Sequence, residues 1–409
     1  MRGLDKKTIG VASLALLLEV ALIGCSDEQK KNAAIIERGT SEPIRIEISD
    51  ANTQEKINLE TIFDSVAFVR LSNSPEAAVS GINQAIVVDS TILILDRYGS
   101  KSVKAFSLTG DYLADIGRRG RGPGEYIEPT MMEVNSRREV VIWDQFRQQL
   151  LHYDFNGKCL RSREYPFLSM KFHEFDDNNL MFVNLNSDNK SFVKDYSLFV
   201  SDSLGVVSKY GLYRKKNTYS TILYDHDVFE KDGDVFYHPV YCDTVFRING
   251  GFVAEPYCWL DFGKKTVPER LRNVAKNRKE VRAEQAKDRY SFMTGNFFLS
   301  DTHLFFEFLR EHYNYRVLYS KSNGKAIAFR ATSGFFPVPF NGFVGSAGEA
   351  FVGYFFPAES LRRMEGLDLE KRDVLEKRFG KQMTDLMCSI KNDDNPIITF
   401  FYPKSTLSE

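Results

Sequence analysis

The 409-residue chain has a formal net charge of −1, so no excess of basic residues points to nucleic acid as a partner. Its 43% hydrophobic and 27% charged residues are typical of a folded globular protein, and its length suits one large domain or two to three smaller ones. Aromatic residues make up 13% of the chain, which favours strands because flat rings pack well on pleated sheets.

The first 25 residues have the pattern of a bacterial export signal. Basic residues precede an apolar run from Ile9 to Ile23, which is too short to span a bilayer comfortably. The run ends at Leu22-Ile23-Gly24-Cys25, which resembles a lipobox, although Glu19 departs from the pattern. We therefore expect residues 1–24 to be a lipoprotein signal peptide and Cys25 to be the lipidation site. The alternative is an ordinary cleaved signal with an incidental cysteine.

The segment after the signal suggests where the protein is displayed. Ser26-Asp27-Glu28 resembles the acidic surface-export tag of Bacteroidetes lipoproteins, and a simple polar linker is the alternative. Residues 25–44 are predicted to be a lipidated tether. No later apolar run reaches transmembrane length. We expect an outer membrane lipoprotein at the cell surface, held to the membrane through the lipid.

An internal repeat is the most informative feature of the rest of the chain. The segment Ile92–Asp96 precedes a polar link and the strand Val103–Phe106, and Val140–Asp144 precedes Leu150–Tyr153 in the same way. Each unit is an apolar strand ending in Asp, a turn, an alternating strand and a glycine turn. The Asp is expected to bind the backbone of the turn. Weaker copies follow at Leu180–Val183 with Tyr196–Val200, at Val235–Tyr237 with Thr244–Gly250, and at Leu304–Phe308 with Tyr315–Tyr319.

Five or six such units at spacings of roughly 40 to 65 residues predict the blades of a β-propeller. Strands at Phe68–Leu71 and Pro396–Tyr402 are expected to share one blade and so close the ring. Two helical insertions are predicted, at 267–290 and at 359–390, the second broken at Gly366.

A glycine-rich motif carries a family resemblance. Ile116 to Tyr126 reads IGRRGRGPGEY and follows the strand Tyr112–Ile116. With Phe68–Leu71, Asp243–Ile248 and Asp394–Ile397, it resembles the Bacteroidetes six-bladed β-propeller lipoproteins, which are related in form to NHL-repeat proteins. The resemblance implies an all-β, six-bladed β-propeller with helical insertions over residues 45–409. It supplies no catalytic residues, and it associates such lipoproteins with glycan acquisition.

The glycine-rich motif is also the first candidate binding site. Four glycines between Gly117 and Gly124 could let backbone N–H groups converge on a phosphate, sulfate or carboxylate, with positive charge from Arg118, Arg119 and Arg121. The alternative is a structural turn between blades. Tyr126 and Trp143 are candidates for stacking on a sugar, with core packing as the alternative.

No metal site or catalytic motif is evident. The histidines form no HxH or HExxH pair: His152, His173, His226, His238, His303 and His312. Calcium or another divalent cation at the acidic turns Asp176–Asn179 or Asp393–Asn395 stays open, with ordinary polar turns as the alternative. No GxSxG elbow is present.

The remaining cysteines fit no CxxC pattern: Cys159, Cys242, Cys258 and Cys388. The second and third of them could form a disulfide or remain buried thiols.

We expect a non-enzymatic binding or scaffolding module that takes a glycan or an outer-membrane protein partner in nutrient acquisition, and no nucleic acid. The alternatives are a metal-dependent lyase or hydrolase acting at the propeller channel, and a purely structural envelope protein.

Overall fold

A computed structural model describes residues 33–184, 189, 193, 195–213, 226–239, 242–268, 283, 287, 290–311 and 313–407. The predicted signal peptide, Cys25, the acidic tag and almost all of the predicted helix at 267–290 lie outside the described residues. Across these described ranges, no helix is both long enough and apolar enough to span a bilayer.

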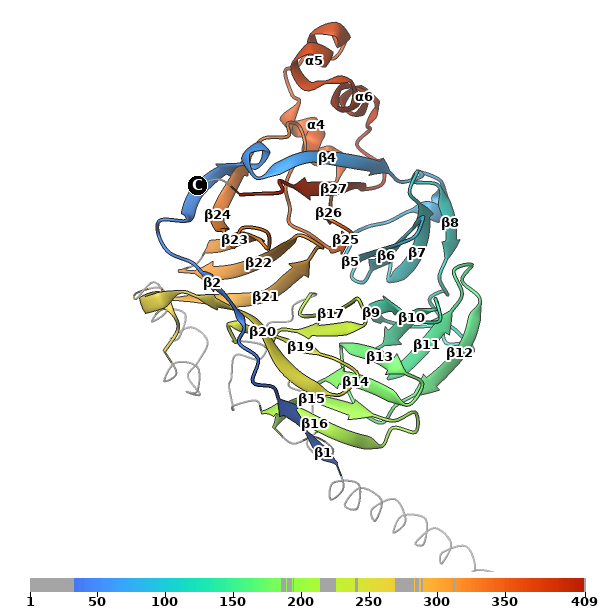
Figure 1. The fold of residues 1–409 in the computed structure, drawn as a ribbon. Coiled ribbons are helices and arrows are strands. Elements are labelled where there is room, and N and C mark those ends of the chain that lie inside the picture. Colours follow the sequence, from blue (N-terminus) through green and yellow to red (C-terminus); the bar gives the residue numbers. More distant parts are fainter. Residues whose placement is uncertain are drawn as a thin grey trace, which may run out of the picture.

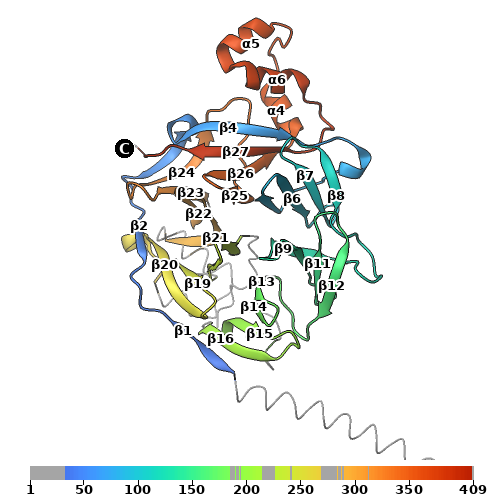
Figure 2. The ribbon, with the colours of Figure 1, turned by 45° about the vertical axis from the view of Figure 1, so that its right-hand side comes forward.

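Antiparallel four-stranded sheets are arranged around a central axis, as Figures 1 and 2 show. The strongest copies of the sequence repeat form two separate sheets of this kind. The first contains β5 (Gln84–Val88), β6 (Thr91–Asp96), β7 (Ser102–Ser107) and β8 (Tyr112–Asp115). The second contains β9 (Pro129–Val134), β10 (Val140–Asp144), β11 (Gln149–Tyr153) and β12 (Cys159–Glu164).

Two further units of four strands are joined into one larger sheet. One contains β13 (Phe172–Asp176), β14 (Asn179–Val183), β15 (Tyr196–Ser201) and β16 (Val207–Tyr213). The other contains β17 (Val228–Lys231), β18 (Asp234–Tyr237), β19 (Thr244–Ile248) and β20 (Val253–Asp261). The strand β1 (Ala34–Arg38) lies between β16 and β20 and is parallel to both.

The last two sheets take strands from both ends of the chain. One contains β21 (Ser291–Leu299), β22 (His303–Arg310), β23 (Tyr313–Ser320), β24 (Ala326–Ser333) and β3 (Thr53–Asn58). The other contains β25 (Gly345–Ala347), β26 (Ala350–Phe355), β27 (Ile397–Pro403) and β4 (Phe63–Arg70). This arrangement of radial antiparallel sheets is a β-propeller, so the predicted fold class is confirmed.

The predicted ring closure is also confirmed. Strand β4 pairs with β27 in antiparallel register, with Phe68 opposite Thr399. The loop before β27 adds to the closure, because the Asn395 side chain donates to the carbonyls of Ser72 and Ala77. Joining the two ends within one sheet closes the ring of blades.

The segment 34–58, called here the N-terminal strap, runs along the outer edge of the ring. After β1, the strand β2 (Ile44–Glu47) continues in parallel with β20, and β3 pairs in parallel with β24. The strap therefore covers the outer strands of successive blades. Its first part lies within residues 25–44, the stretch that the sequence assigns to a tether, so from Ala34 onward this stretch belongs to the folded ring.

Three short helices occupy the second predicted insertion and project from one side of the ring (Figure 1). They are α4 (Pro357–Arg363), α5 (Arg372–Phe379) and α6 (Lys381–Ser389). Gly366 and Gly380 have positive φ angles and separate them. Leu375 and Leu386 are buried in the cluster that also contains Phe355 of β26, so the helices pack onto the propeller. Single 3₁₀ turns occur at Leu59–Thr61, Pro75–Ala77 and Gly263–Lys265.

Candidate functional site

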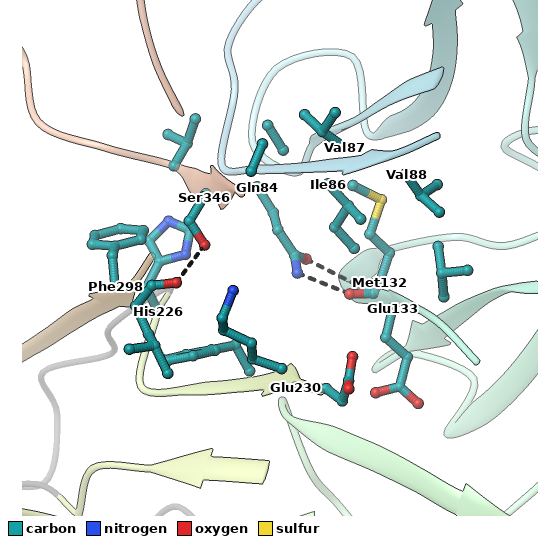
Figure 3. A pocket seen from close by; sticks show the side chains of 18 of the residues that line it. Gln84, Ile86, Val87, Val88, Met132, Glu133, His226, Glu230, Phe298 and Ser346 are labelled. Atoms are coloured by element: carbon teal, nitrogen blue, oxygen red, sulfur yellow. Dashed lines mark hydrogen bonds between the residues drawn. The ribbon is translucent and has the colours of Figure 1, made fainter. Parts of the chain in front are cut away.

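A cavity of about 320 Å³ lies where the inner strands of several blades meet (Figure 3). Its lining comes from β5, β9, β17, β21 and β25 or the turns beside them. Since these are the innermost strands of their sheets, the cavity lies on the propeller axis. Its volume is at the lower end of the range of roughly 300–1,000 Å³ that is usual for small-molecule sites.

The walls of the cavity combine apolar and polar side chains. Ile86, Met132 and Phe298 supply apolar surface, while Glu133 and Glu230 supply carboxylates (Figure 3). Such a mixture suits a ligand that has both apolar faces and hydrogen-bonding groups.

Two of the polar side chains hold neighbouring blades together. The Gln84 side chain donates to the carbonyl of Met132 over 2.8 Å and accepts from its N–H over 3.0 Å, which joins β5 to β9. The Glu133 carboxylate accepts from the backbone N–H of Glu174 over 2.8 Å and lies 2.9 Å from Nδ1 of His173, which joins β9 to β13. These groups therefore fix the shape of the cavity wall.

The end of β17 carries the more accessible charges. Glu230 is exposed to the cavity and accepts from the N–H of Gly233 over 2.6 Å. Lys231 is paired with Asp301 at 2.6 Å, so its charge is balanced within the wall. The Glu230 carboxylate keeps acceptor capacity for a bound molecule, because an ionised carboxylate has about four lone-pair sites.

At the inner edge of the wall, His173 is 6% exposed. Burial works against its protonation, but the Glu133 carboxylate outweighs burial, and the pKa of His173 is raised above its ordinary value. The Glu133 carboxylate therefore favours the charged form of the His173 ring at this buried position next to the cavity.

A cluster of metal-ligating groups lies nearby, with Glu139 in the turn between β9 and β10, His152 on β11 and Glu174 on β13. Glu139, His152 and Glu174 place one ligand atom each within 4.8 Å of one another. The guanidinium of Arg161 already binds both oxygens of Glu139, at 2.6 and 2.7 Å, and lowers the pKa of Glu139 to about 2. The donor types fit a divalent cation, but Arg161 supplies the positive charge that such a cation would bring.

The glycine-rich loop lies between β8 and β9, and its own carboxylate fills it. The Glu125 side chain accepts from the N–H of Gly122 at 2.7 Å and from Nε of Arg118 at 2.6 Å, and both contacts lower the pKa of Glu125. Arg118, Arg119 and Arg121 are exposed. Ligand binding by these three arginines stays a prediction.

Tyr126 and Trp143 have no exposed surface. The Tyr126 hydroxyl accepts from the N–H of Val103, and the Trp143 indole donates to the carbonyl of Ser169 at 2.6 Å. Both rings belong to hydrophobic clusters, so in this structure neither faces a surface on which a sugar could stack.

The acidic turns proposed for calcium are occupied by local contacts. Asp176 accepts from the N–H of Asn178, and Asp394 pairs with Arg70 at 3.0 Å.

The structure brings His152 and His173 into the two clusters above and places His226 beside the cavity, with its ring 4.6 Å from that of Phe298.

The remaining histidines and the cysteines lie apart from the cavity. His238 contacts the Cys242 carbonyl, His303 contacts Thr302, and His312 lies outside the described residues. The four cysteines of the described residues are not joined by disulfide bonds: Cys159, Cys242, Cys258 and Cys388.

Sequence reasoning missed the cavity residues because they come from short stretches of five strands that lie far apart in the sequence. The apolar alternation in those strands was visible, but nothing in a single strand indicates which residues meet on the axis.

Comparison with known proteins gives a family but no activity. The family model described as "Domain of unknown function (DUF4934)" matches residues 43–402. No protein with a curated description matches the sequence.

Among solved structures, a putative exported protein from Bacteroides fragilis NCTC 9343 is similar, with a TM-score of 0.71 and 20% identity over 89% of this chain and 100% of that one. A member of the duf4221 family from Bacteroides vulgatus has a TM-score of 0.49 and 7% identity, over 84% and 97% of the two chains. BamB from Moraxella catarrhalis has a TM-score of 0.37 and 10% identity, over 70% and 72%. At these identities the likeness is one of fold.

Proposed function

The chain belongs to the DUF4934 family, a family of unknown function, and we propose that it is an exported lipoprotein that binds a glycan fragment in its axial cavity without transforming it. Lipidation at Cys25 would hold it at the outer membrane, on the cell surface. Its role would be ligand capture in nutrient acquisition.

The axial cavity is the observation that carries this proposal. Sugars present hydroxyl groups around apolar ring faces, and the cavity offers the Glu230 carboxylate beside the apolar side chains of Ile86 and Phe298. The wall is held in shape by the hydrogen bonds of Gln84 and Glu133, and a preformed wall reduces the entropy cost of binding.

Export and blade number are part of the same proposal. The lipobox at Cys25 supports export, as does the fold likeness to a Bacteroides protein described as a putative exported protein. The four-stranded units from β5–β8 to β25–β4 support the six-bladed count.

Thermal unfolding of the mature chain with a panel of mono- and oligosaccharides tests the proposal. A bound sugar at 100 times its dissociation constant should add about 2.7 kcal/mol to the free energy of unfolding. Glu230→Gln should weaken that sugar at least tenfold, because it removes the charge while keeping the contact to Gly233. Glu365→Gln, an exposed change beyond α4, is the matched control.

Two outcomes would count against glycan binding in the cavity. The first is that no sugar in the panel raises the unfolding temperature of the protein. The second is that a sugar raises the unfolding temperature of the Glu230→Gln variant as much as that of the native chain. Recovery of one outer-membrane protein by crosslinking on intact cells would then favour a protein partner.

The metal-dependent lyase or hydrolase is the second candidate, and it depends on the Glu139, His152 and Glu174 cluster. It requires a divalent cation that displaces Arg161 from Glu139. Stoichiometric metal in the purified protein that is lost in His152→Ala would support this candidate. Metal-free protein whose unfolding is unchanged by a chelator would argue against it.

A further inference from the structure

The first described strand, β1, lies at the outer edge of the ring, on the β13–β16 blade. Ala34, the first residue of β1, lies opposite Lys209 of β16. Lys209 is close to the start of β16, which follows the turn at 202–206. The incoming chain therefore reaches the propeller beside this turn.

The distance from the lipid to this edge is short. Eight peptide steps separate Cys25 from Ala33, the first described residue. Even a fully extended chain spans at most about 28 Å over eight residues. The helices α4–α6 lie on the opposite side of the ring from β1 in both views (Figures 1 and 2).

The turn at 202–206 carries an unusual exposed side chain. Leu204 is 85% exposed, the highest value among the large apolar side chains of the described residues. The same type of turn, with the glycine N–H bound to the carbonyl three residues earlier, joins the third and fourth strands of the β5–β8 and β9–β12 blades. Those turns have Thr109 and Asn156 in the place of Leu204.

A single exposed leucine is ordinary on a protein surface, so its exposure alone does not indicate a contact surface, whereas its position beside the tether does. The tether reaches the β13–β16 blade, and on this blade Leu204 occupies the turn position that is polar in the β5–β8 and β9–β12 blades. Ile35 of β1, which is 59% exposed, adds a second apolar side chain on the same edge. Both would lose contact with water if this edge lay against a bilayer.

We propose that the edge formed by β1 and the 202–206 turn faces the membrane, with Leu204 and Ile35 in contact with the phospholipid surface and α4–α6 pointing away from it. The proposal depends on the lipid anchor of the proposed function. It adds a fixed orientation, because a short tether alone would let the propeller turn freely.

Fluorescence quenching in lipid vesicles tests this orientation. The full lipidated protein carrying Leu204→Trp is placed in phosphatidylethanolamine–phosphatidylglycerol vesicles with brominated acyl chains, which quench only nearby indoles. Leu113→Trp, at a leucine that is 52% exposed on β8, is the matched control. Trp143 is fully buried and Trp259 is partly buried, and both are present in each variant, so the unsubstituted protein in the same vesicles gives their signal for subtraction.

We expect the added fluorescence of Leu204→Trp to fall by at least half in brominated vesicles, and that of Leu113→Trp to stay unchanged. Equal quenching of the two variants, or quenching of neither, overturns the orientation. Mass spectrometry of the same samples tests the lipid anchor separately from the orientation. Absence of lipid on Cys25 removes the anchor and the orientation together, whereas lipid on Cys25 with an unquenched indole removes the orientation alone.

Discussion

Buried aspartates at the ends of β6 and β10 bind the backbone of the turns that follow these strands. Asp96 is 1% exposed and accepts from the N–H groups of Ser80, Gly99 and Ser100. Asp144 is fully buried and accepts from four backbone N–H groups, two in the preceding loop and two in the turn. A buried carboxylate is tolerated here because its oxygens are surrounded by donors.

Asp144→Asn should therefore lower the free energy of unfolding by about 2–3 kcal/mol, since the amide NH₂ would face backbone donors. The matched change Asp89→Asn breaks only an exposed ion pair with Arg138 and should cost less than about 1 kcal/mol. Urea unfolding of the mature variants measures both values. Equal effects of the two substitutions would contradict the role assigned to Asp144.

The His173–Glu133 ion pair should make stability depend on pH. Because the pKa of His173 is raised in the folded protein, its contribution is present below the ordinary value of 6.5 and is lost as the pH rises through the folded pKa. The Glu133 carboxylate lies 2.9 Å from the ring, and Glu174 and Glu230 add further negative charge.

His173→Gln keeps a hydrogen-bond donor but removes the titrating group. We expect the difference in unfolding free energy between the native chain and this variant to shrink between pH 6 and pH 9. Chemical denaturation at a series of pH values measures it. A difference that stays constant or grows with pH would show that Glu133 does not stabilise the charged ring.

Residue identity alone could not distinguish a binding aromatic from a core aromatic. The strand pattern around Trp143 predicted β10 correctly, but the burial of its ring depends on Tyr165, just after β12, and on Phe182 of β14. The contacts of Asp96 and Asp144 with the turns that follow them were predictable, because these partners lie only two to four residues along the chain. Their contacts with Ser80, Ile127 and Glu128 span 16 or 17 residues and had no such local signal.

At the scale of elements, the N-terminal strap is the feature that the sequence concealed. β1 has only five residues, and its partners lie about 175 and 216 residues further along the chain, as the pairs Ala34–Lys209 and Glu37–Val253 show. A short segment with distant partners has no local signal beyond weak alternation. The repeat strands were predictable because each pairs with its neighbour across a short turn.

Removing residues 33–48 should expose the edges of β16 and β20 and delete three buried isoleucines, Ile36, Ile46 and Ile48. We expect a loss of stability on the order of 5 kcal/mol and association through the open edges. Light scattering after size exclusion, compared with a chain beginning at residue 33, measures the association. A stable monomer after the deletion would show that the strap does not protect these edges.

At the scale of the whole molecule, the two chain ends hold the ring closed. The β4–β27 pairing supplies most of the contact, and the Asn395 side chain binds the segment after β4 through three hydrogen bonds, including one from the N–H of Val79 at 2.9 Å.

Asn395→Ala should cost about 2 kcal/mol of unfolding free energy, because two carbonyls and one N–H lose their partner at a part-buried site. Asn156→Ala, at an exposed turn of the β9–β12 blade, should change stability by less than about 0.5 kcal/mol. Thermal unfolding of both variants tests the comparison. If Asn395→Ala does not change the free energy of unfolding, the β4–β27 pairing alone keeps the ring closed.

The β4–β27 pairing also sets the order in which the protein can fold. Phe68 pairs with Thr399, so this pairing joins the two ends of the chain. The N-terminal strap can pair only once β16, β20 and β24 are available. Contacts so distant in sequence form slowly. An exported chain that emerges with its N-terminus first would carry unpaired strands until residues 397–403 arrive, and unpaired strands are prone to aggregate. The edges that β27 and the strap cover in the folded protein therefore stay unpaired for as long as the ring is open.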